Sequence, residues 1–166
     1  MGFRAVLLAL LAGLVQPASA QLLLENVVQD RVVSVEYNSE EMADAVRRAR
    51  GTLASFFELA ANPRPGTGKF AVKIGLPTDR GKEFVWAKLL RHGNGRVVAR
   101  IDNTPRWTTK FHDGQTLAFT DAAIIDWLYV DGDRLKGNFT GCAINKLVSE
   151  PEAEAVRMRF RMTCEE

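Results

Sequence analysis

The chain has 166 residues, a formal net charge of +2 and a hydrophobic content of 46%. A charge so close to balance excludes a general attraction to nucleic acid or to anionic membranes. The length is ample for one hydrophobic core, so we expect one domain rather than several.

Residues 1–20 have the pattern of a cleavable secretory signal peptide. Arg4 precedes an apolar run, Ala5–Val15, and the small residues Ala18-Ser19-Ala20 suit a signal peptidase. The run is shorter than the roughly 20 residues that span a bilayer, which favours cleavage over an uncleaved membrane anchor. The sequence therefore predicts a mature single domain over residues 21–166, a periplasmic or secreted location, and no integral membrane segment after cleavage.

Two elements are expected at the start of the mature chain. Leu22–Tyr37 is rich in valine and favours a strand. Asn38–Ala61 is the clearest helix, because its apolar side chains recur at steps of three and four residues and form one stripe. Asn38 and Glu41 form a capping-box pattern at its start, whereas Gly51 is a weak point inside it. We expect this helix to pack on a sheet.

The stretch from Lys69 onward has the character of strands. Phe84–Asp102 predicts a β-hairpin, because Asn94-Gly95 is a strong short-range hairpin signal between two alternating segments. Other strands are expected at Lys69–Ile74, Trp107–Phe111, Leu117–Phe119, Ile124–Val130 and Leu135–Thr140.

The C-terminal part carries mixed signals. Ala143–Val148 predicts a short helix, and Ser149–Glu152 is typical of a second helix start, with Pro151 in the first turn. In Ala153–Cys164, however, apolar residues alternate with arginines, and this period of two favours a strand. One helix followed by short strands indicates the α+β class: an antiparallel, strongly bent sheet with one long N-terminal helix packed on a face.

Cys142 and Cys164 are the only cysteines in the chain. In an oxidising compartment two such cysteines usually pair. The alternative, a pair of catalytic or metal-binding thiols, would need further ligands, and the sequence offers only His92 and His112 and no CxxC motif. The sequence favours a structural disulfide and no metal site.

Asp126 is the first candidate for chemistry, because it is an acidic residue inside an apolar run. A carboxylate is costly to bury unless it is hydrogen-bonded or paired. One interpretation is a carboxylate in a pocket, with Trp127 and Tyr129 binding a ligand and His112 as an acid–base partner. The other is a structural carboxylate that accepts backbone amides or pairs with an arginine. The sequence favours the structural interpretation and leaves both open.

Arg106 and Trp107 form a candidate contact site, since arginine and tryptophan are enriched at interface hot spots. Polar neighbours make Trp107 the tryptophan that we expect to be most exposed. No GxSxG, HExxH or phosphate-loop motif is present, so no cofactor is indicated. The leading hypothesis is a non-enzymatic binding domain of the cell envelope with an envelope protein as partner. The alternative is a small envelope hydrolase that uses Asp126 with a histidine.

Five motifs rich in glycine and aromatic residues follow one another along the chain. They are Gly81–Trp86, Gly95–Pro105, Gly114–Phe119, Ile124–Tyr129 and Gly137–Thr140. In order and spacing this set resembles the bacterial DUF2314 (YegJ-like) domain family over about residues 70–147. We expect the family-like core of the domain to occupy about residues 66–147. The family has no assigned function. The resemblance therefore implies a compact domain in a bacterial envelope setting and supplies no reaction, cofactor or site residue.

Overall fold

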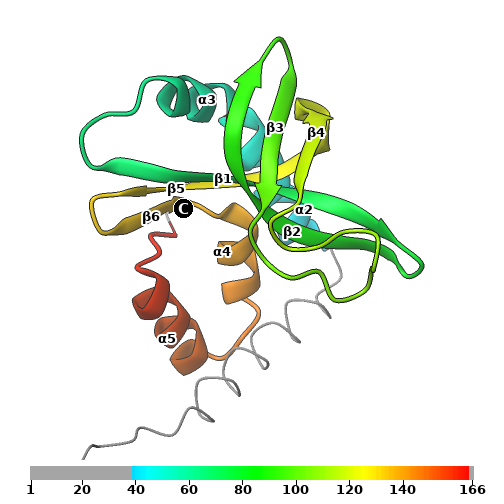
Figure 1. Cartoon of the computed structure of the whole chain (residues 1–166). Coiled ribbons are helices and arrows are strands. Elements are labelled where there is room, and N and C mark those ends of the chain that lie inside the picture. Colours follow the sequence, from blue (N-terminus) through cyan, green and yellow to red (C-terminus); the bar gives the residue numbers. More distant parts are fainter. Residues whose placement is uncertain (1–38, 165–166) are drawn as a thin grey trace, which may run out of the picture. The chain divides into compact units, whose positions relative to one another are not determined.

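The computed structural model of the protein describes residues 39–164 (Figure 1). The predicted signal peptide and the predicted strand over residues 22–37 lie outside the described residues. The described elements are α2 (Glu40–Gly51), α3 (Leu53–Ala61), β1 (Thr67–Thr78), β2 (Gly81–Gly93), β3 (Arg96–Ile101), β4 (Thr116–Thr120), a 3-10 turn η1 (Asp121–Ala123), β5 (Ile124–Asp131), β6 (Arg134–Gly137), α4 (Phe139–Asn145) and α5 (Glu150–Phe160).

The strands form one open sheet in the order β4-β3-β2-β1-β5-β6, and every neighbouring pair is antiparallel. This confirms the α+β class and the antiparallel sheet. The predicted hairpin is also confirmed, because β2 and β3 pair across Asn94-Gly95. Register shifts interrupt the pairing of β1 with β5 and of β2 with β3. Such bulges bend a strand and increase its twist.

The register of β1 decides which side chains share a face of the sheet. Val72 pairs with Trp127 of β5, so both point to the same side. The next residue, Lys73, pairs with Asp126 of β5 and with Trp86 of β2, and these three point to the other side. A polar group of residues therefore lies directly behind the apolar face.

The apolar face carries the hydrophobic core under α2 and α3. The ring of Phe56 in α3 stacks on that of Trp127, with centroids 5.1 Å apart. The indole Nε1 of Trp127 donates to the carbonyl oxygen of Ala49 in α2 at 2.9 Å, so the helix backbone satisfies this buried donor. The helix α4 packs mainly against α2, and its first turn is bonded to Asp126 of β5. Figure 1 shows α3 and α4 on different sides of β1 and β5.

The N-terminal helix expected over Asn38–Ala61 is present as two helices, α2 and α3. The break falls at Thr52, next to Gly51. The Thr52 hydroxyl donates to the carbonyl oxygen of Arg48 at 2.8 Å, where a side chain competes for the helix carbonyls. A flexible glycine beside such a competitor accounts for the interruption.

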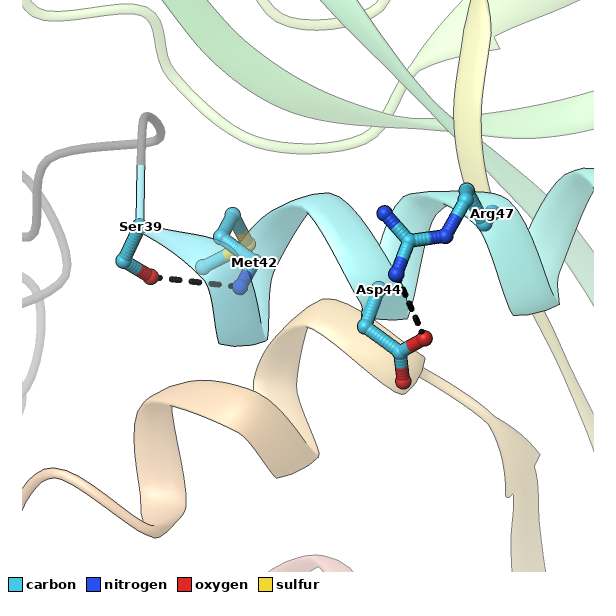
Figure 2. Close-up of polar contacts among 4 residues, drawn as sticks. All are labelled: Ser39, Met42, Asp44 and Arg47. Atoms are coloured by element: carbon cyan, nitrogen blue, oxygen red, sulfur yellow. Dashed lines mark hydrogen bonds and ion pairs between the residues drawn. The ribbon is translucent and has the colours of Figure 1, made fainter.

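The start of α2 is capped by Ser39, whereas the sequence favoured Asn38, which lies outside the described residues. Figure 2 shows the Ser39 hydroxyl accepting a hydrogen bond from the backbone N–H of Met42 at 3.2 Å. One turn on, Arg47 pairs with Asp44 at 3.0 Å on the exposed side of the helix. The capping serine and the acidic first turn thus begin the helix locally.

Four expectations of local structure differ from the structure. Ala153–Cys164 is not a strand, because residues up to Phe160 belong to α5. Trp107–Phe111 forms no strand. The strand expected over Leu135–Thr140 ends at Gly137, and the helix expected from Ala143 begins earlier, at Phe139.

The disulfide between Cys142 and Cys164 is confirmed, with Cα atoms 5.5 Å apart. It joins α4 to the segment that follows α5. The same segment makes a parallel bridge from Met162 to Leu135 of β6. Among residues 39–164 no helix is both long and apolar enough to cross a membrane.

Candidate functional site

Asp126 is fully buried on β5, and its carboxylate is surrounded by donors. Oδ1 accepts from the backbone N–H groups of Trp127 at 2.8 Å and of Phe139 at 3.2 Å. Oδ2 accepts from the backbone N–H of Thr140 at 2.8 Å and from the Thr140 hydroxyl at 2.6 Å. The carboxylate therefore satisfies the first amides of α4 and fixes this helix to the sheet.

Lys73 extends this arrangement into a buried chain of three polar side chains. Its Nζ donates to the Thr140 hydroxyl oxygen at 3.0 Å, and that hydroxyl in turn donates to Asp126. Lys73 is 5% exposed and Thr140 is fully buried. The ammonium also lies over the ring of Trp86, 5.3 Å from its centroid. Thr140 thus links the side chains of Lys73 and Asp126 through hydrogen bonds.

Burial dominates the electrostatics of Asp126. Loss of solvation raises the pKa of this carboxyl above its usual value of 3.8. The hydrogen bond from the Thr140 hydroxyl, the positive charge of Lys73 and the backbone amides act in the opposite direction and are smaller.

Neither histidine is a partner of Asp126 among the residues that the structure describes. His92 stacks on Phe57, with centroids 3.5 Å apart, and its Nε2 lies 3.2 Å from Asp121. His112 contacts the carbonyl oxygen of Asp113 at 2.8 Å in an exposed turn. Within the described range no group of three or more histidine, cysteine or acidic residues is placed to hold a metal ion. No observation therefore favours the hydrolase hypothesis.

Trp127 and Tyr129, the aromatic candidates beside Asp126, lie in a packed aromatic cluster. Trp127 is 8% exposed. Its ring also meets Phe139 edge-on at 5.3 Å between centroids. Tyr129 is half-buried and stacks on Trp127 at 6.0 Å and on Phe70 at 5.6 Å. These contacts account for both rings by packing alone.

Arg106 and Trp107 belong to an irregular segment that a buried glutamate holds in place. Glu83 of β2 is 7% exposed. Its Oε1 accepts from the backbone N–H of Arg106 at 2.6 Å, and its Oε2 accepts from that of Trp107 at 2.9 Å. The neighbouring Asn103 accepts from the backbone N–H of Trp86 at 2.8 Å. Charge-assisted bonds to both carboxylate oxygens fix this segment without a strand.

A groove of about 580 Å³ lies between this segment and the turn that joins β1 to β2. We call it the hairpin groove. Arg106 is exposed and Trp107 is half-buried, and both line it. Its described lining residues are Pro77, Thr78, Asp79, Arg80, Arg106, Trp107, Thr108, Thr109 and Lys110. The groove thus brings together the two contact residues that the sequence indicates and the β1–β2 turn, which it does not.

A smaller hollow of about 100 Å³ lies beside the disulfide. It is lined by Arg48, Lys136, Gly137, Phe139, Cys142, Thr163 and Cys164. It contains neither a predicted contact residue nor Asp126.

Comparison with known proteins places the chain in a family. A family model described as "Uncharacterized protein conserved in bacteria (DUF2314)" matches residues 39–160. The chain belongs to the DUF2314 family. The match includes α2 and α3, which the sequence motifs place outside a family core of about 66–147.

One curated relative has the same character. Uncharacterized protein YegJ of Escherichia coli (strain K12) is 32% identical over 136 residues, which cover 81% of this chain and 86% of YegJ. No solved structure matches the chain. Family membership therefore identifies a protein conserved in bacteria and carries no activity with it.

Proposed function

We propose that this DUF2314 protein is exported to the bacterial cell envelope, where it acts as a non-enzymatic binding domain that holds an envelope protein in the hairpin groove. One observation carries the proposal: Arg106 and Trp107, the residue pair that suits an interface hot spot, both line the hairpin groove. The buried carboxylate of Glu83 fixes the backbone of both residues, so the contact surface is preorganised.

The burial and the hydrogen bonds of Asp126 support a binding role over catalysis. A general acid or base must reach a proton of the substrate, directly or through one water. Asp126 is fully buried and accepts four hydrogen bonds from Trp127, Phe139 and Thr140. Its carboxylate serves the fold.

The proposal of export rests on the pattern of residues 1–20 and is tested by mass spectrometry of the recovered protein. We expect the protein recovered from the bacterial envelope fraction to lack these residues and to begin at Gln21. The cytoplasmic fraction provides the control, because precursor that has not been exported keeps Met1. Recovery of the uncleaved chain from the cytoplasm alone would contradict export.

The binding role is tested by photo-crosslinking in cells that express the full chain. A photoreactive amino acid is placed at Thr109, an exposed residue in the groove lining, and in a matched protein at Thr116, an exposed residue of β4 outside it. We expect a discrete protein adduct from position 109 that Trp107→Ala removes, and none from position 116. Equal adducts from both positions, or an adduct that Trp107→Ala leaves unchanged, would exclude the groove as the binding site.

A further inference from the structure

The cations of the hairpin groove indicate what kind of partner it binds. Three of the described lining residues, Arg80, Arg106 and Lys110, are basic, and Asp79 is the only acidic one. All four are exposed. The whole chain carries a net charge of only +2, so this positive field is local and does not reflect a generally basic protein. A groove of this sign attracts anionic groups.

The cations are presented by short segments with internal hydrogen bonds. The backbone N–H of Arg80 donates to the Thr78 hydroxyl at 3.1 Å, and that of Lys110 donates to the Thr108 hydroxyl at 3.1 Å. Glu83 fixes the backbone at Arg106 and Trp107 in the same lining. Preorganised charges lose less entropy on binding than charges on mobile loops.

Trp107 narrows the class of anion. Its half-buried indole lies among the cations and offers an apolar face beside them. Clusters of basic residues recognise acidic peptide motifs, and tryptophan with arginine dominates protein interfaces. Single-stranded nucleic acid instead requires successive aromatic platforms along a basic channel, and the described lining has one aromatic ring.

We propose that the hairpin groove recognises an acidic peptide segment, whose carboxylates meet Arg80, Arg106 and Lys110 while an apolar side chain packs on Trp107. This inference rests on the proposed function and specifies the chemistry of its partner.

The test uses the mature chain and a fluorescent peptide of repeated Glu-Asp-Ala-Leu units, with binding followed by anisotropy. We expect the double variant Arg80→Glu/Lys110→Glu to bind about tenfold more weakly or worse, equivalent to about 1.4 kcal/mol. We also expect added salt to weaken binding, and the matching peptide with Gln and Asn in place of Glu and Asp not to bind.

The matched control is Arg96→Glu/Arg91→Glu, which makes the same charge change at exposed positions outside the groove lining. It should bind within about twofold of wild type, since distant exposed charges are largely screened. Circular dichroism of each variant shows whether the fold is retained. If Arg80→Glu/Lys110→Glu does not fold, Lys110→Gln provides the same comparison with a smaller expected loss.

Four outcomes would overturn the inference. They are no binding of the acidic peptide to wild type, equal binding of the neutral peptide, equal loss in the groove and control variants, and tighter binding of single-stranded DNA or anionic vesicles of phosphatidylglycerol. The proposed function is judged separately by the crosslink at Thr109. If a Trp107-dependent adduct forms and the crosslinked segment of the partner is not acidic, the acidic-peptide inference fails and the binding role survives.

Discussion

Asp126 is a carboxylate in the interior whose proton balance is coupled to folding. Burial raises its pKa above 3.8, so the folded chain holds this proton more readily than the unfolded chain does. The contribution of Asp126 to the free energy of unfolding is therefore fully present below pH 3.8 and is lost as the pH rises through the folded-state pKa.

Asp126→Asn removes this titration and provides the measurement. We expect the free energy of unfolding of wild type, minus that of the variant, to decrease as pH rises from about 3.8 toward neutrality. Denaturant titrations of both proteins over that range give the difference, in which the titrations of other groups cancel. A difference that increases with pH would mean that Lys73 and the donors outweigh burial.

Thr140 links Lys73 to Asp126, and its hydroxyl can be removed with little change of shape. Thr140→Val leaves the Lys73 ammonium and one carboxylate oxygen without that partner in the interior. We expect a loss of about 1–3 kcal/mol in the free energy of unfolding, measured by chemical denaturation. Thr116→Val, at an exposed threonine of β4, should stay within about 0.5 kcal/mol. Equal effects of the two substitutions would show that the hydroxyl bridge adds nothing.

The sequence singles out Asp126 but not its partners, for a physical reason. An acidic residue inside an apolar run differs from its neighbours in polarity, so it can be recognised from that one segment of the sequence. Lys73 alternates with apolar residues, as an exposed lysine on a half-buried strand does. Its burial depends on the pairing of β1 with β5 and on the position of Thr140 in α4, which are contacts between segments far apart in the chain.

At the level of elements, Glu83 holds the segment that carries Arg106 and Trp107 where regular pairing is absent. Glu83→Ala removes both acceptors, whereas Glu83→Gln keeps one carbonyl oxygen. We expect faster amide hydrogen exchange at Arg106 and Trp107 in both variants, larger in the alanine variant, with a loss of about 1–3 kcal/mol in its free energy of unfolding. Exchange followed by NMR or mass spectrometry is the measurement.

Lys88→Ala, at an exposed position of the same strand, is the control for Glu83 and should leave exchange at the two amides unchanged. Unaltered protection of these amides in Glu83→Ala would mean that the groove lining is held by other contacts.

The error over α5 shows how far alternation alone can predict an element. A period of two indicates a strand only if the apolar residues are buried. Met158 is 66% exposed and Phe160 is 50% exposed, so the alternation of apolar residues with arginines does not reflect burial against a core. The local signals decide instead: Ser149 and Glu152 form a capping box, and Pro151 lies in the first turn. The hairpin at Asn94-Gly95 was predictable because its turn chemistry and its alternation agree.

For the whole molecule, the disulfide limits the freedom of the unfolded chain. Cys142 and Cys164 are 22 residues apart. We expect the double variant Cys142→Ser/Cys164→Ser to lose about 3 kcal/mol in the free energy of unfolding, measured by denaturation. Wild type with its disulfide reduced should unfold at the same denaturant concentration as the double variant. If reduction has no effect while the serine variant is destabilised, the loss comes from the serine side chains and not from the lost bridge.

The fold class could be predicted from the sequence because it depends on a few strong local signals, whereas the groove could be predicted only in part. Arg106 and Trp107 stand out by residue type. The turn at Thr78–Arg80, which forms the other wall, has no distinctive composition, and its approach to these residues requires the folded β2.

The bridge also decides how the protein responds to mechanical force. Because Cys164 is covalently joined to Cys142, tension applied at the C-terminus passes through the sulfur atoms directly into α4. The helix α5 lies inside the closed loop and bears none of this load. A pull at the C-terminus would therefore load α4 and its hydrogen bonds to the Asp126 carboxylate without first unwinding α5.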